Sequence, residues 1–397
     1  MGLRERLGRL TGAPTPPTEG SGSFSARLAR LRPASSRGAA AAPHPADEWA
    51  LAELLSAERL APGVLRCERR LAAGVCHGAV ELDRVRDALP ELFDGPVGDP
   101  GAWVFLDTET SGLAGGTGTW VFQLGVLRPA ADGWRLRQYL LARLDAEPDF
   151  LAAAAAELSG SGLLVTYNGK TFDRPLLATR FRLCGIADPL AEVAHLDLLA
   201  PVRRAFSSVW RDCRLASAEE RLLGFRRQGD LPGSAAPQAW LDWLRHGRSA
   251  PLAAVLRHND WDLLSLAALA VPLAASFRDP LGMGASVHSI AGYHLSRGVP
   301  QRAFAVLSAQ REGLDVPALR LLAELHRRRG EWEQACQIWL RLAERDEPAA
   351  LEALAKYYEH RCADHAAALD FAERLPPGAG RERRCGRLRA RLAARAG

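Results

Sequence analysis

Two acidic residues in the motif FLDTETSGL have the spacing of a metal site. Asp107 and Glu109 follow an apolar run and occupy alternate positions. Alternate residues of a strand point to the same face, so the two carboxylates should lie close together. Neighbouring carboxylates raise each other's pKa unless a cation neutralises them, and Mg²⁺ prefers oxygen ligands. The pair therefore predicts a divalent-metal site, with solvated acids at a strand end as the alternative.

A second motif, LVTYNGKTFDRPLL, places Asp173 at the start of an expected helix. An acid at this position also interacts favourably with the helix dipole, so a purely structural role is the alternative. Lys170 is the only lysine before residue 356 and lies three residues from this acid, where it could meet a phosphate. We therefore take Lys170, together with Thr110 and Asn168, as candidate substrate-binding residues.

The third motif, RHNDWDLLSLAAL, is expected inside a helix. His258 and Asp262 are four residues apart and share one helix face, whereas Asp260 points elsewhere. Taken alone, the pair is most simply an ordinary surface interaction. A neutral imidazole at this position could also order or deprotonate a water molecule.

Apolar runs and turn residues predict the elements that position these motifs. Three consecutive strands should form an antiparallel meander, and helices and strands alternate after them. The expected strands are 103–106, 119–127, 134–141, 163–167 and 194–198, with helices at 148–158 and 171–184 and mainly helices from there to Ser276. This order is that of an α/β, ribonuclease H-like mixed sheet flanked by helices.

Together the three motifs resemble the exonuclease motifs of the DEDD superfamily. Over about residues 100–275 the chain resembles more closely the YprB-like ribonuclease H-like domain family, through GLAGGTGTWVFQLG, TYNGKTFDRPLL, HLDLLAPVRRAF, GDLPGS and HNDWDLLSL. The resemblance implies Asp107, Glu109, Asp173 and Asp262 as metal ligands. It also implies a catalytic role for His258, which is a histidine at the spacing of the superfamily's tyrosine.

The resemblance implies phosphodiester hydrolysis with two ions of Mg²⁺ or Mn²⁺. We expect a 3′-5′ exonuclease that acts on single-stranded ends of DNA or RNA. One alternative is a catalytically weak adaptor that binds nucleic acid or protein through helical repeats. Another is an endonuclease or junction resolvase on the same fold, because a fold alone does not define the reaction.

An internal repeat of 32 residues follows this domain and predicts helix pairs over residues 284–392, close to the tetratricopeptide pattern. Small and large apolar residues recur at matching positions: Val287, Leu319 and Leu351; Ile290, Leu322 and Leu354; Ala303, Ala335 and Ala367; Leu307, Trp339 and Phe371. Stacked helix pairs of this kind share a core and offer a surface to a possible protein partner.

The rest of the 397-residue chain divides by composition. Residues 1–46 hold seven arginines and two glutamates, which accounts for the whole net charge of +5 and predicts a disordered basic tail. We expect a helical segment with two short helices at 47–98 and the ribonuclease H-like domain at 99–278. Arg203 and Arg204 are candidate phosphate contacts, with solvated helix charge as the simpler interpretation. Asp197 is expected to be structural.

Cysteine usage and hydropathy bear on the cellular compartment. The seven cysteines are scattered and never spaced as CxxC, which argues against disulfides and a structural zinc site. We expect no membrane span, because no apolar run approaches the roughly 18–20 residues required. These features predict a cytoplasmic protein.

Overall fold

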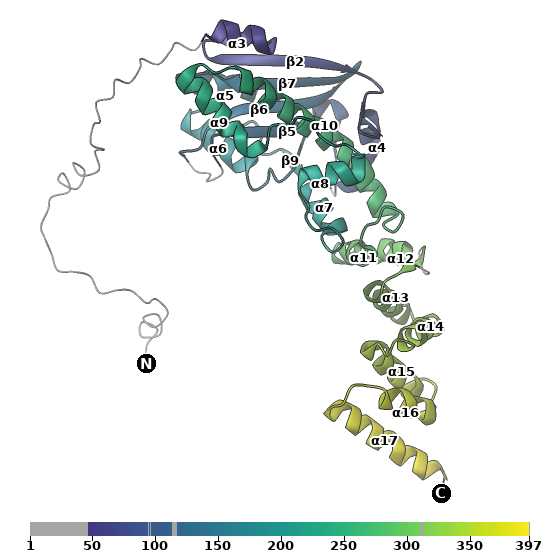
Figure 1. Cartoon of the computed structure of the whole chain (residues 1–397). Coiled ribbons are helices and arrows are strands. Elements are labelled where there is room, and N and C mark those ends of the chain that lie inside the picture. The colour runs from purple at the N-terminus through teal and green to yellow at the C-terminus, as the bar shows by residue number, and fades with distance from the viewer. Residues whose placement is uncertain (1–46, 94, 96, 113–116, 310–312, 397) are drawn as a thin grey trace, which may run out of the picture. The chain divides into compact units, whose positions relative to one another are not determined.

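The computed structural model describes residues 47–93, 95, 97–112, 117–309 and 313–396 (Figure 1). The predicted basic tail at 1–46 lies outside the described residues, as do residues 113–116 between the first two predicted strands.

A seven-stranded mixed sheet carries the predicted motifs. Its strand order is β1-β2-β7-β6-β5-β8-β9, in which β5, β8 and β9 are parallel neighbours and the other pairs are antiparallel. The strands are β1 (Glu58–Ala61), β2 (Val64–Ala72), β5 (Trp103–Thr110), β6 (Val121–Ala130), β7 (Gly133–Leu141), β8 (Leu163–Thr166) and β9 (Ala194–Asp197). The predicted meander is β5, β6 and β7, so the ribonuclease H-like mixed sheet is confirmed.

The segment at 47–98 contains more than the two helices expected. Helices α3 (Glu48–Leu55) and α4 (Val85–Leu92) are present, but β1 and β2 lie between them and extend the sheet beyond β7. A small hairpin of β3 (Cys76–His77) and β4 (Val80–Glu81) follows. The expectation of a purely helical segment was wrong because β2 carries charges rather than an apolar alternation. Its Glu68 pairs across the sheet with Arg137 of β7, at 2.7 Å.

Helices cover both faces of the sheet. Trp103 and Phe105 of β5 pack in one core with α4, α7 and most of α10, whereas Val104 and Leu106 pack in a second core with α5, α6 and α9. This division follows from the alternation of side chains along a strand. The helices of this part are α5 (Glu147–Leu158), α6 (Asp173–Leu183), α7 (Leu199–Phe206), α8 (Leu215–Ala218), α9 (Ala236–His246) and α10 (Ala250–Arg278).

Helix α10 packs directly on β5 and β6 (Figure 1). Gly125 of β6 lies opposite Asp107, and a Cβ at this glycine would stand 2.0 Å from Oδ1 of Asn259. The missing side chain therefore permits the close approach that brings α10 to the acidic strand. By length and composition α10 could cross a membrane, but 72% of its most apolar stretch is buried within the protein, as in a core helix.

A helical C-terminal region follows, with helices α11 (Val287–Ser296), α12 (Pro300–Ser308), α13 (Val316–Arg328), α14 (Trp332–Ala343), α15 (Pro348–His360), α16 (His365–Glu373) and α17 (Ala379–Ala396). Most positions of the 32-residue pattern are buried. In α16, however, Ala368 is buried in place of the expected Ala367. The turn before α16 is one residue longer than the pattern requires and includes Ala363 at a positive φ of 53°.

Candidate active site

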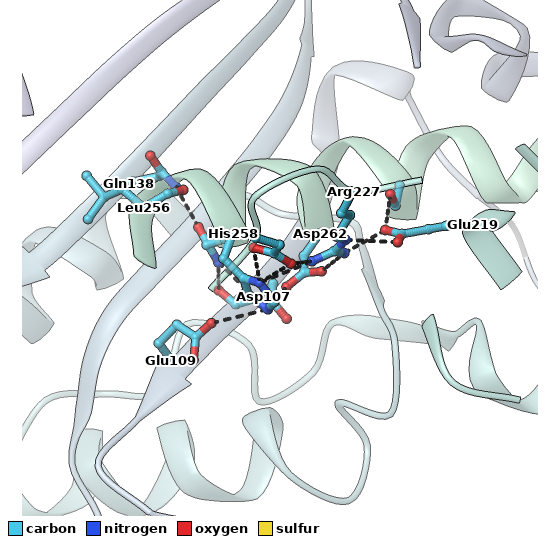
Figure 2. A network of polar contacts seen from close by, with 11 residues as sticks. Asp107, Glu109, Gln138, Glu219, Arg227, Leu256, His258 and Asp262 are labelled. Atoms are coloured by element: carbon cyan, nitrogen blue, oxygen red, sulfur yellow. Dashed lines mark hydrogen bonds and ion pairs between the residues drawn. The ribbon is translucent and has the colours of Figure 1, made fainter. Parts of the chain in front are cut away.

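Strand β5 ends in the acidic pair that the sequence singled out. Asp107 lies opposite Gly125 and Glu109 lies opposite Gln123 on β6, so both carboxylates share one face of the sheet. This is the face on which α10 packs. The side chains of Asp107, Glu109, His258 and Asp262 gather between the strand and the helix (Figure 2).

Burial and mutual repulsion raise the pKa of these acids. The pKa of Asp107 lies well above its usual value, first because the carboxyl group is buried and then because Asp262, Asp173 and Glu109 are negatively charged neighbours. The pKa of Glu109 rises to about 8 for the same two reasons. All four predicted acids therefore lie close enough to destabilise one another's charge.

Asp173 enters the site as the first residue of α6. Its carboxylate accepts a hydrogen bond from Oγ1 of Thr108, the residue between the two acids of β5. Burial raises the pKa of Asp173 to about 6, while the Thr108 hydrogen bond lowers it. The contact ties the start of α6 to the end of β5.

On α10, Asp262 and His258 face the acidic pair. Nε2 of His258 lies 3.4 Å from Oδ2 of Asp262 and 4.0 Å from Oε1 of Glu109. One ligand atom from each of these three residues fits within 4.8 Å of the others, as ligands of one metal ion would. Asp260 points elsewhere, as expected, and pairs with Arg69 at 2.7 Å.

His258 is oriented by a residue that the motifs did not single out. Its Nδ1 lies 2.8 Å from Oδ2 of Asp230, in the loop that precedes α9. A carboxylate only accepts hydrogen bonds, so the Asp230 contact favours the tautomer with the proton on Nδ1 and the lone pair of Nε2 toward the site. Nη1 of Arg227 lies 3.2 Å from the same Nδ1. Asp230 belongs to the segment GDLPGS quoted for the family resemblance, but its spacing gave no sign of a contact with His258.

Arg227 is the second residue that sequence reasoning missed. Its guanidinium donates to the carboxylates of Asp262 and Glu219, with the Glu219 contacts at 2.6 and 2.9 Å (Figure 2). The Glu219 side chain is only 1% exposed and also accepts a hydrogen bond from Ser265. Burial raises the pKa of Asp262, and the positive charge of Arg227 opposes that rise.

Asn259 holds the acidic strand against α10. Its Nδ2 donates to Oδ2 of Asp107 at 2.8 Å, and its Oδ1 accepts from Nε2 of Gln138 at 2.9 Å. Gln138 also donates to the carbonyl of Leu256 (Figure 2). Asn259 lies within the third motif, but its contact with Gln138 could not be predicted from the sequence, because the pairing of β7 with β6 brings Gln138 to it.

The candidate substrate-binding residues lie at the end of β5 and in the loop that follows β8. Thr110 donates to the carbonyl of Gly112 at 3.0 Å, and Asn168 adopts a positive φ of 67° directly after β8. Lys170 is exposed, and among the described residues its ammonium has no ion-pair or hydrogen-bond partner. Asp197 accepts the backbone N–H groups of Asn168 and Lys170 at 2.7 and 3.0 Å, so it fixes this loop as a structural acid.

The donor set of the site suits a hard divalent cation. Four carboxylates supply the oxygen ligands that Mg²⁺ and Mn²⁺ prefer. Burial and mutual repulsion raise the pKa of Asp107 and Glu109, and a bound cation would favour their charged forms. Glu109, His258 and Asp262 form the cluster that could hold an ion, and the carboxylates of Asp107 and Asp173 could add further oxygen ligands. Arg227 already neutralises part of the charge of Asp262, so at this carboxylate a positively charged side chain competes with a metal ion.

The sequence matches a family model and a known relative. A model of the RNase_H superfamily matches residues 104–274. The uncharacterized protein YprB of Bacillus subtilis (strain 168) is 31% identical over 280 residues, which span 68% of each chain. The family B DNA polymerase of Pyrobaculum calidifontis is similar with a TM-score of 0.34 and 18% identity, over 57% of this chain and 29% of the polymerase. The chain belongs to the family of YprB and carries an RNase_H superfamily domain.

Proposed function

We propose that the protein is a metal-dependent nuclease that hydrolyses phosphodiester bonds. The observation that carries the proposal is the convergence of four carboxylates and His258 at the end of β5, on an RNase_H superfamily domain. A pair of bound Mg²⁺ or Mn²⁺ ions would supply charge neutralisation and electrostatic stabilisation of the phosphate during hydrolysis. Asp107, Glu109, Asp173 and Asp262 would hold the ions.

We further propose 3′-5′ exonuclease action on single-stranded DNA or RNA ends. His258 takes the proton of the attacking water at Nε2, because Asp230 keeps the proton of the neutral ring on Nδ1. Lys170, Asn168 and Thr110 contact the strand, and the unpaired ammonium of Lys170 faces its phosphates. The DEDD character of the site and these residue roles are part of the proposal.

The activity test uses a single strand labelled at its 5′ end, with Mn²⁺ or Mg²⁺ added. Wild-type protein should shorten the strand in a ladder, and Asp107→Asn should abolish the ladder. Asp260→Asn is the matched control, because Asp260 lies between His258 and Asp262 in the third motif but pairs with Arg69 outside the site. Cleavage of a closed circular strand would instead indicate an endonuclease. If neither wild type nor Asp107→Asn cleaves DNA or RNA, the nuclease proposal is excluded and the adaptor alternative is favoured.

The C-terminal helices support partner binding as a second function. A pocket of about 970 Å³ lies among α13, α14 and α15, lined by aromatic and charged residues that include Trp332 and Tyr357. We propose that α11–α16 are tetratricopeptide-like repeats and that this pocket receives a protein partner in the cytoplasm. Alanine substitution of Tyr357 should abolish capture of that partner while the nuclease ladder persists. If this substitution abolished both partner capture and the nuclease ladder, the two functions would not be separate.

A further inference from the structure

A second pocket, of about 630 Å³, lies beside the loop that leads to Asp173. It is lined by Tyr167 and Asn168 at the end of β8, by α7, and by the segment 207–215 that follows α7. Because Asn168 is one of its lining residues, the pocket is continuous with the loop that presents Lys170 and begins α6. A strand whose end lies among the carboxylates could extend into this pocket.

The pocket is positively charged because its three arginines outnumber the one acid among its described lining residues. Arg203, Arg211 and Arg214 are exposed, and their guanidinium groups make no ion pair or hydrogen bond within the described part of the chain. Asp212 is the one acidic lining residue among those described, and it accepts hydrogen bonds from Ser217 and from the backbone of Arg214. Three cations and one anion give the pocket a formal charge of +2.

The cations of the larger pocket among α13–α15 are arranged differently. There Arg327 donates to Glu324 at 2.7 Å, and Lys356 pairs with Glu352 at 2.7 Å. These two cations are neutralised by the protein, and Arg361 of the same pocket lies over the Trp332 ring. The arginines beside Asn168, in contrast, make no ion pair within the described part of the chain. This difference favours the smaller pocket as the binding site for an anion.

The wall that carries the arginines is held in place by fixed contacts. The Tyr167 hydroxyl donates to the carbonyl of Cys213 at 2.6 Å, which ties segment 207–215 to the end of β8. Trp210 stacks on Phe206 of α7 with 3.9 Å between ring centroids, and the Arg221 guanidinium lies over the same ring. The arginines therefore project from a pre-organised surface, which lowers the entropy cost of binding a ligand.

We propose that this pocket is a subsite for the phosphodiester backbone of the nucleic-acid strand whose end lies at the carboxylates. The proposal rests on the proposed nuclease function. Guanidinium groups match the geometry of phosphate oxygens and bind them with charge-assisted hydrogen bonds. Arg203, Arg211 and Arg214 contact successive phosphates, and Asn168 marks the boundary between the subsite and the reacting end.

Binding is measured by fluorescence anisotropy in the Asp107→Asn background, with labelled single-stranded DNA and RNA oligonucleotides long enough to pass the pocket. Replacing Arg203, Arg211 and Arg214 together by Gln should weaken binding by at least about tenfold, because three charge-assisted contacts are lost. The slope of log affinity against log salt should become shallower by about 2, at roughly 0.7 per phosphate contact. A larger loss for one nucleic acid would identify the preferred substrate.

The matched control replaces Arg84, Arg86 and Arg383 by Gln, which removes the same charge from exposed arginines outside the pocket. The proposal is overturned if this control loses as much affinity and salt slope as the pocket variant, or if neither loses any. It is also overturned if polyglutamate of equal charge displaces the strand as effectively as unlabelled strand. Cleavage by protein with intact Asp107 is measured separately. If this protein is inactive but the pocket substitutions still weaken strand binding, the result contradicts the nuclease proposal and not the subsite.

Discussion

Arg227 joins Asp262, a predicted metal ligand on α10, to Glu219, an acid buried beneath it. The guanidinium thus occupies part of the coordination space of Asp262 while it neutralises Glu219. Both the affinity of the site for a cation and the stability of the fold should depend on this one side chain.

We expect Arg227→Gln to bind Mn²⁺ more tightly than wild type, because a competing cation is removed from Asp262. The same variant should lose about 3–5 kcal/mol of stability, because the nearly inaccessible Glu219 is left without its counter-ion. Titration calorimetry with Mn²⁺ and urea unfolding measure the two effects. Arg226→Gln is the control, since Arg226 is 77% exposed and pairs with Glu220 at the surface. Unchanged or weaker Mn²⁺ binding in Arg227→Gln would contradict the competition.

Without added metal, the stability of the protein should fall as the pH rises from about 4 to about 8. The folded protein raises the pKa of Glu109 from 4.5 to about 8, so it holds a proton that the unfolded chain releases at lower pH. This stabilisation is fully present below the unfolded pKa and is lost as the pH passes the folded pKa. Asp173, with a pKa near 6, acts in the same direction.

The measurement is the urea midpoint with a chelator across this range, repeated with excess Mg²⁺. Mg²⁺ should raise the midpoint most at the alkaline end, where the carboxylates are ionised and can bind it. A Glu109→Gln variant should show a smaller pH dependence than wild type. A chelated protein that becomes more stable towards pH 8 would contradict the assignment of these shifts.

Asp230→Asn should lower kcat by about 10²-fold or more with little change in KM, because the amide no longer fixes the proton of His258 on Nδ1. His258→Ala should lower kcat by a similar factor. The double variant should be no slower than the slower single variant, since the two side chains act as one unit. Additive losses in steady-state kinetics on the labelled strand would show that Asp230 acts independently of His258.

Gly125→Ala should destabilise the protein by about 1–3 kcal/mol, because the new methyl group would overlap Asn259 and force α10 away from β6. The Asn259 contact with Asp107 should be lost with it, so nuclease activity should fall as well. Gly292→Ala is the matched control, since no atom lies within 4 Å of the added Cβ in α11. That control should gain a few tenths to about 1 kcal/mol. Equal stability of the two variants in urea would show that α10 does not depend on Gly125.

The sequence predicted the central part of the fold because its elements are patterned by burial. Strands β5, β6 and β8 are apolar on both faces, and α10 combines an apolar surface with the polar motif that closes the site. Strand β2 was not predicted from the sequence, because ion pairs such as Glu68 with Arg137 stabilise it in place of apolar contacts. Charge alternation of this kind has no distinctive period.

The predicted acids of the site do lie together, and their roles as metal ligands stay a prediction. Arg227 and Asp230 could not be predicted from spacing, because each reaches α10 from a loop more than 25 residues earlier in the chain. Asn259 looked like one polar residue among several in its helix. Its importance depends on Gln138, which only the register of β7 against β6 brings within 2.9 Å.

The position of β2 beside β7 also determines where the ribonuclease H-like domain can be cut. Residues 133–141 of β7 pair with residues 64–72 of β2 along their whole length. A fragment limited to the RNase_H match at 104–274 would keep every predicted acid but leave β7 with a row of unsatisfied N–H and C=O groups. Such an exposed edge is a template for intermolecular strand pairing, so the shortened protein should aggregate even though its active-site residues are intact.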